Sequence, residues 1–167
     1  MSELKPLKTE LIPQALAKAE RYRLLNEPAE SESICRDVLV ADPDNQRAIV
    51  WLLLSITDQI AFNRHGAAQE ARGLLAKLES EFERKYYAGV IAEREGKARL
   101  RSGQPRSGFH AYDLLRRAMQ SFDEANRISA PDNDDAVLRY NSCVRMLEAH
   151  PELRPEPVDE YEANMLE

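Results

Sequence analysis

Glycine, cysteine and aromatic residues are all scarce in this chain. Of its 167 residues, 6 are glycine and 2 are cysteine, and aromatic residues make up 7%. Little glycine, prolines placed where helical patterns begin or end, and apolar spacing that is helical nearly throughout together predict an all-α protein. Cys35 and Cys143 fall on apolar helical positions without a close-spaced partner, which favours two buried, reduced thiols over a disulfide or a metal site.

Long hydrophobic runs are absent as well. The longest apolar stretch, residues 48–56, is far shorter than the roughly 20 apolar residues that a transmembrane helix needs. The first residues are polar, whereas a secretion signal would have a hydrophobic run there. We therefore expect a cytoplasmic protein with no membrane segment.

Charge, by contrast, is abundant and unevenly distributed. Charged residues make up 31% of the chain, and the net charge is −6. Residues 1–83 carry a net charge of −4, residues 84–127 have 10 basic and 5 acidic residues for +5, and residues 128–167 have 3 basic and 10 acidic residues for −7. The basic block and the acidic C-terminal end could attract each other, or each could serve an outside partner.

Helical periodicity predicts seven helices. Each has apolar residues spaced three and four apart, so that they share one face. The expected ranges are about 13–25, 29–41, 46–61, 67–80, 83–100, 109–129 and 133–149. The boundary between the fourth and fifth helices is the least marked, because neither proline nor glycine separates them.

One helix-ending phrase occurs twice. Pro-Asp-Asn stands at 43–45 and again at 131–133, each time after an amphipathic helical pattern. Proline does not continue a helix, and Asp or Asn can cap the helix that follows. Recurrence of such a phrase predicts stacked helical hairpins, an architecture that usually binds rather than catalyses.

Several residues in these hairpins match a known repeat. Ala19 and Tyr22 stand at the small and aromatic positions of its first helix, and Ala118-x₃-Phe122 before Pro131 is similar to the end of its second helix. The chain therefore resembles the tetratricopeptide-repeat (TPR) family. The resemblance covers repeats at about 12–45, 46–82 and 83–132 and a capping helix at 133–149.

The resemblance implies a right-handed α-solenoid of about seven antiparallel helices over residues 1–150. It also implies a non-enzymatic scaffold or adaptor that binds a peptide or protein segment in the concave groove made by the first helix of each pair. The residues expected in that groove are Leu16, Glu20, Arg23, Val50, Leu54, Thr57, Tyr86, Val90 and Glu93. Such a mixed apolar and charged groove suits an amphipathic helix or an extended segment. The alternative fold is an irregular helical bundle.

The basic block suggests a different function. Its residues could contact an anionic partner: Lys97, Arg99, Arg101, Arg106, Arg116 and Arg117. A nucleic-acid-associated adaptor would use them, with Phe109 and Tyr112 nearby for base stacking. The acidic pI of about 5.2 opposes phosphate binding, so we rank nucleic acid below a protein partner. A non-catalytic subunit of an enzyme complex is a further alternative.

Catalytic and metal-binding patterns are missing from the sequence. His65, His110 and His150 stand in a turn, at a helix start and beside a helix end, and none has a carboxylate or thiol at metal-ligand spacing. We expect no enzymatic activity, no cofactor and no metal ion.

The end of the chain is rich in proline and acidic residues. Residues 151–167 are therefore expected to form a flexible acidic tail, which either solubilises the protein or occupies the basic block or the groove. The terminal repeat could also pair with a second copy in a homodimer.

Overall fold

The structure, a computed structural model, describes residues 3–62 and 64–157. Its helices are α1 (Ile12–Leu24), α2 (Pro28–Ala41), α3 (Gln46–Asp58), α4 (Ala67–Leu75), α5 (Glu81–Arg101), α6 (Ser107–Arg127) and α7 (Asp135–Ala149). Short 3₁₀ turns cover Thr9–Leu11 and Gln59–Phe62. No strand occurs in these residues, which confirms the prediction of an all-α chain.

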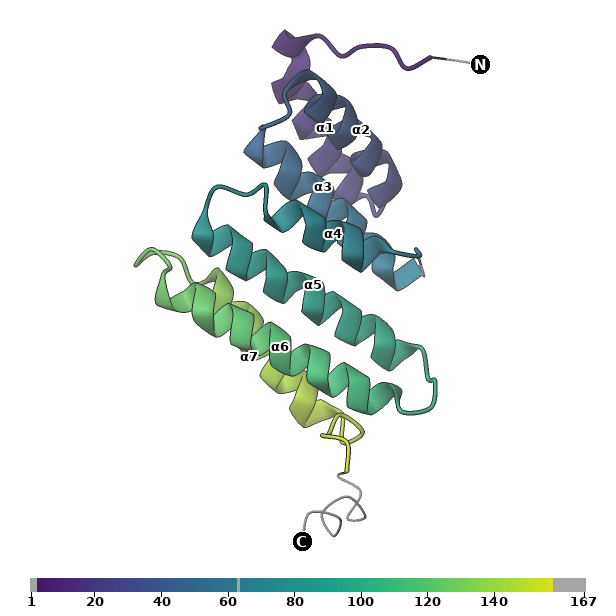
Figure 1. Ribbon diagram of the computed structural model, residues 1–167, viewed down its shortest axis with the longest axis vertical. Helices are drawn as coiled ribbons and strands as arrows, with labels where there is room; N and C mark the ends of the chain where they lie inside the picture. Colours follow the sequence, from purple (N-terminus) through teal and green to yellow (C-terminus); the bar gives the residue numbers. More distant parts are fainter. Residues whose placement is uncertain (1–2, 63, 158–167) are drawn as a thin grey trace, which may run out of the picture.

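Consecutive helices pack against each other in chain order. Each helix contacts the next, and the contact between α5 and α6 is the most extensive. Helix α1 also contacts α3, and α3 contacts α5. In Figure 1 the helices follow one another along the long axis, from α1 and α2 at one end to α6 and α7 at the other. Helices α1, α3 and α5 therefore lie beside one another.

Asparagine side chains mark the helix boundaries that the repeated phrase predicts. Asn45 caps α3, because its Oδ1 accepts a hydrogen bond of 3.0 Å from the Ala48 N–H. At the second copy, Asn133 Oδ1 accepts a bond of 3.0 Å from the Asp135 N–H at the start of α7. Asn26 adopts a left-handed φ of 61° between α1 and α2, which is a common way to end a helix. The prediction of helix ends at these places is confirmed.

The segment between α3 and α5 differs from the expected ranges. Helix α3 stops at Asp58, and α4 stops at Leu75, five residues before its expected end. The Gln46 side chain holds the chain after α4, donating to the Lys77 carbonyl at 3.2 Å and accepting from the Glu79 N–H at 2.9 Å. These contacts join residues more than 30 positions apart, so local periodicity could not reveal them.

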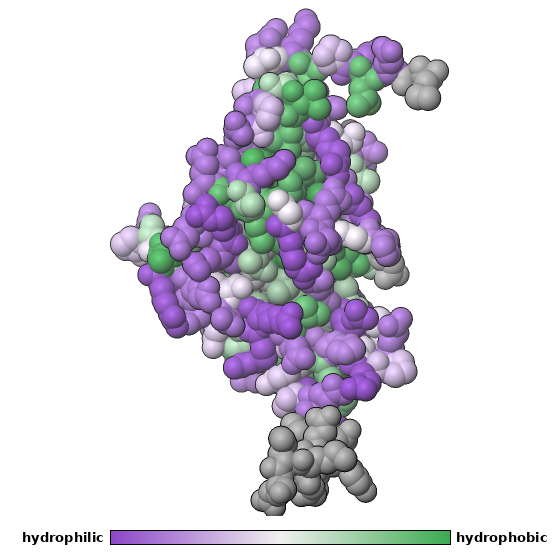
Figure 2. All heavy atoms as spheres, viewed as in Figure 1, coloured by the Kyte–Doolittle hydropathy of each residue, from purple (hydrophilic) through white to green (hydrophobic). Residues whose placement is uncertain are grey.

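The hydrophobic core extends through the helix stack in connected clusters. The central cluster joins α1 through α5, with Leu53 and Ile56 among its fully buried residues. A second cluster joins α5, α6 and α7 around Phe122. Figure 2 shows hydrophobic residues mainly between the helices of the N-terminal half, while hydrophilic residues cover most of the rest of this view. Within the described residues, no helix combines the length and apolarity that crossing a bilayer requires.

The close contact between α5 and α6 depends on a glycine. A Cβ atom on Gly89 would lie 2.6 Å from Phe122 Cε1 and 2.7 Å from Cδ1. The Phe122 ring has no exposed surface and packs against Tyr86, at 5.8 Å between ring centroids. Because the ring is enclosed, it has little room to yield.

After α7 the chain turns back over the start of α6. Leu153 is buried within the cluster of α5, α6 and α7, and the Glu152 carbonyl lies where a Cβ on Gly108 would meet it, at 2.5 Å. Arg154 lies over the Phe109 ring, and Arg106 pairs with Glu156. The first residues of the expected tail thus pack on the domain. Residues 158–167 lie outside the described part, so flexibility there stays a prediction.

Gly89→Ala should destabilise the protein by about 1–3 kcal/mol, because overpacking outweighs the gain in helix propensity. Gly73→Ala is the matched control, since Gly73 also lies inside a helix and a Cβ there would meet nothing within 4 Å. That control should stabilise the protein by about 0.5–1 kcal/mol. Urea unfolding followed by circular dichroism measures both changes, and equal effects of the two variants would contradict the close contact.

Both cysteines are buried, with exposed fractions of 0% for Cys35 and 1% for Cys143. Burial raises the pKa of Cys35 from 9.0 to about 11 and that of Cys143 from 9.0 to about 12. Because the folded state favours the neutral thiols, their contribution to stability is present below pH 9.0 and is lost as the pH rises towards the folded-state pKa values.

We therefore expect iodoacetamide to alkylate the native thiols at least about 100-fold more slowly than those of the urea-unfolded chain near pH 8. Mass spectrometry of samples quenched over time measures both rates. Equal native and unfolded rates would contradict the burial of the thiols.

Candidate functional site

The odd-numbered helices carry two clusters of charged side chains, which we call the odd-helix face. Its cations and carboxylates come from all four odd-numbered helices: Arg23 from α1, Asp58 from α3, Glu93, Arg94 and Lys97 from α5, and Arg139 from α7. The two clusters meet on α5, where Glu93 and Arg94 are consecutive residues.

Asp58 is the centre of the first cluster. Its carboxylate pairs with Arg23 Nε at 2.7 Å and with Arg94 Nη1 at 2.7 Å. Arg94 Nη1 also donates to the Leu54 carbonyl at 3.0 Å and to the Thr57 hydroxyl. A cation at the last turn of α3 is favoured by the helix dipole. The cluster therefore joins α1, α3 and α5.

Glu93 is the centre of the second cluster. Its side chain is fully buried, and its carboxylate pairs with Lys97, one turn later on α5, and with Arg139 Nη1 of α7 at 3.1 Å. The two cations are about one-third exposed, at 33% and 35%. A buried carboxylate is costly unless it is paired and hydrogen-bonded. Glu93 thus holds Lys97 and Arg139 at the surface above it.

The guanidinium pKa values of Arg94 and Arg139 shift in opposite directions. The pKa of Arg94 is lowered by burial, and by the nearby charges of Arg23 and Arg139, although Asp58 opposes the shift. Burial would also lower the pKa of Arg139, but Glu93 and the Tyr86 hydroxyl outweigh it and raise that pKa. Arg23 lies over the Trp51 ring, 5.2 Å from the ring centroid, which adds a cation–π contact.

The nine residues expected in a groove fall into two groups. Four are buried and belong to the packing beneath the surface: Leu16, Thr57, Val90 and Glu93. Five are partly exposed: Glu20, Arg23, Val50, Leu54 and Tyr86. Helical periodicity does not indicate how deeply the neighbouring helices cover each of these residues.

Sequence reasoning missed three charged members of the odd-helix face: Asp58, Arg94 and Arg139. A weak signal was available for Arg94, which follows Glu93 in a helix otherwise apolar on that side. Asp58 and Arg139 carried none, because their partners lie 35 and 46 positions away in the sequence.

The basic block does not form one surface. Lys97 belongs to the odd-helix face and the exposed Arg101 follows it one turn later on α5, whereas Arg99 lines a hollow beside α4. Arg106 pairs with Glu156. The other two members, Arg116 and Arg117, line an open hollow of about 740 Å³ between α6 and α7, together with Asp113 and Asp123. The block therefore divides among several sides of the molecule.

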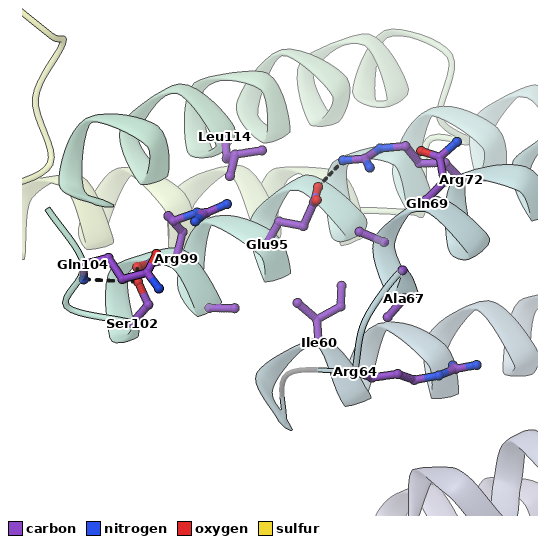
Figure 3. Close-up of a pocket in the computed structure, with 13 residues that line it drawn as sticks. Ile60, Arg64, Ala67, Gln69, Arg72, Glu95, Arg99, Ser102, Gln104 and Leu114 are labelled. Atoms are coloured by element: carbon purple, nitrogen blue, oxygen red, sulfur yellow. Dashed lines mark hydrogen bonds and ion pairs between the residues drawn. The ribbon is translucent and has the colours of Figure 1, made fainter. Parts of the chain in front are cut away.

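The hollow beside α4 has a volume of about 430 Å³ and is lined by α4, the second half of α5 and Leu114 of α6 (Figure 3). Arg72 points toward Glu95 and pairs with it, while Arg64 extends away from Glu95. Arg64 pairs instead with Glu32 at 2.9 Å and Glu70 at 2.8 Å. Because Arg64 and Arg72 are already neutralised and Arg99 is an exposed side chain, we assign no ligand to this hollow.

Metal ligands do not gather anywhere in the described residues. No group of three or more His, Cys, Asp or Glu side chains there is arranged to hold a metal ion.

Comparison with known proteins adds no further assignment. No protein-family model matches the sequence, no curated protein matches it, and no solved structure matches it. The function must therefore be argued from the geometry of the chain itself.

Glu93→Gln should destabilise the protein by about 1–3 kcal/mol at neutral pH, because the amide leaves two partly buried cations without a counter-charge. Glu124→Gln is the matched control, since Glu124 also pairs with one lysine, Lys85, at 2.9 Å, but on the exposed surface of α6. The control should change stability little. Urea unfolding measures both, and a Glu93→Gln variant as stable as the control would contradict a structural role for the carboxylate.

Proposed function

We propose that this protein is a non-enzymatic, cytoplasmic binding module, a TPR-like right-handed α-solenoid that holds a peptide or protein segment on its odd-helix face. The repeated Pro-Asp-Asn phrase supports the repeat architecture. Both copies connect an even-numbered helix to the next odd-numbered one, α2 to α3 and α6 to α7. In the proposed architecture the three repeats are α1–α2, α3–α4 and α5–α6, and the capping helix is α7.

The contacts between odd-numbered helices support a concave odd-helix side. Helix α1 contacts α3 and α3 contacts α5, and the charged clusters add side-chain links from α1 to α5 and from α5 to α7. Among the described residues, no two even-numbered helices contact each other as extensively as α1 and α3, although the Arg36–Glu70 ion pair joins α2 to α4. Helices packed more closely on one side bend the stack toward that side, which is how solenoids form extended concave binding surfaces.

The observation that carries the binding proposal is the composition of the odd-helix face. Half-buried apolar and aromatic residues lie beside partly exposed cations: Trp51, Leu54, Tyr86 and Tyr87 with Arg23, Arg94, Lys97 and Arg139. Aromatic and arginine side chains are the residue types that contribute most to protein interfaces. The division of the basic block argues against the nucleic-acid alternative, which needs a continuous positive path along a backbone.

A photo-crosslinking experiment tests the proposal. A benzophenone amino acid replaces an exposed residue either on the odd-helix side, at Arg47 or Arg101, or on the even-helix side, at Val40 or Gln120. We expect the two odd-helix positions to capture a shared protein from native lysate and the two even-helix positions to capture little of it. Capture that is equal at all four positions, or confined to Val40 and Gln120, would contradict binding on the odd-helix face.

A further inference from the structure

We infer that the odd-helix face selects an acidic segment of an external partner, whose carboxylates meet Arg23, Arg94, Lys97 and Arg139. This inference rests on the proposed function and names the chemistry of the partner. The acidic segment can lie anywhere in the partner's sequence, because the cations belong to two clusters and do not form a single pocket that would hold a chain end.

The odd-helix face has more cations than carboxylates. Asp58 is shared by Arg23 and Arg94, and Glu93 is shared by Lys97 and Arg139. Each cluster thus has two cations and one carboxylate, so each carries one positive charge in excess. Glu93 is also buried beneath its two cations, which leaves the positive groups as the part that a partner meets.

The arginines of the odd-helix face have more hydrogen-bond donors than they use. A guanidinium has five N–H donors and no acceptor. Within the described part of the chain, Arg23 donates through Nε alone and Arg94 through Nη1 alone. Both central carboxylates already have two cationic partners each. The odd-helix face therefore has unused N–H donors and excess positive charge. A carboxylate-rich segment provides the matching acceptors and negative charge.

Charge is also graded along the face. The Tyr87 hydroxyl lies two turns before Arg94 on α5. Its pKa is raised to about 12, mainly by burial and in addition by the nearby carboxylates of Glu83 and Asp135. Lys97 and the exposed Arg101 extend the opposite, basic end of α5. An acidic segment is thus directed toward the second half of α5 and kept away from the first.

The acidic charge of the whole protein does not cancel this local preference. Charges separated by more than a Debye length, about 8 Å at physiological ionic strength, are largely screened from one another. The two excess cations lie at the binding surface itself, where a partner's carboxylates meet them in direct contact. Contact selectivity is therefore set by the local excess.

Selection from a random twelve-residue peptide library displayed on phage tests the inference with the full chain. The key variant is Arg23→Gln with Lys97→Gln, which removes both excess charges but leaves Asp58 paired with Arg94 and Glu93 paired with Arg139. The matched control is Arg116→Gln with Arg117→Gln on α6, which changes the net charge equally and alters no ion pair among the described residues. Circular dichroism and thermal melting confirm that both variants fold.

We expect the wild-type chain to enrich peptides rich in Asp and Glu, and fluorescence anisotropy to show at least about tenfold weaker binding of the best peptide to the key variant. The control should bind within about twofold of the wild type. Should the key variant fail to fold, Lys97→Gln alone removes the excess charge of the second cluster and leaves Glu93 paired with Arg139, and it should still bind the best peptide more weakly than the control does.

Other outcomes separate the inference from the proposed function. Enriched peptides that are neutral or basic, or equal weakening by the key variant and the control, would overturn the acidic preference while leaving a binding module intact. A library from which the wild type selects nothing counts against both. If only a shortened chain that ends at Pro157 selects peptides, the protein's own acidic end would be the segment that binds the face in the full chain. That result would overturn the inference of an external partner.

Discussion

The Glu93 carboxylate is fully buried, and its two counter-charges come from different parts of the chain, Lys97 from the next turn of α5 and Arg139 from α7. Because a buried carboxylate is costly unless it is well paired, the second counter-charge favours the position of α7 in which Arg139 reaches Glu93. Asp58 imposes the same condition on α1 and α5 through Arg23 and Arg94. Apolar packing alone would tolerate small shifts of one helix along another, whereas these pairs specify the alignment of all four odd-numbered helices.

The same pairs determine what the surface offers to other molecules. The buried Glu93 carboxylate stabilises the helices and also presents Lys97 and Arg139 outward, whereas Asp58 is about as exposed as Arg23 and Arg94. Structure and recognition therefore share residues: the side chains that align the odd-numbered helices are those that give the face its positive excess. This explains how a chain with a net charge of −6 can carry a local surface of the opposite sign.

Local sequence signals predicted most of the helices, because the chemistry of a helix end is local. Asn45 and Asn133 accept backbone hydrogen bonds within three residues of themselves, so their positions could be anticipated. The end of α4 could not, since the Gln46 side chain of α3 holds the following turn from a distance in sequence. Leu153 was assigned to a flexible tail for a similar reason: only the packed α5, α6 and α7 provide the site that buries it.

The sequence by itself determined the all-α class, the apolar stripe of each helix and the recurring turn after α2 and α6, since each depends on residues a few positions apart. Only the tertiary structure decided that Thr57, Val90 and Glu93 are covered, while Arg94 and Arg139 reach the surface. It also decided that the basic block divides among several sides of the molecule. The physical reason is that helical periodicity states which side chains share a face, whereas burial and ion pairing depend on neighbouring helices that lie tens of residues away in the sequence.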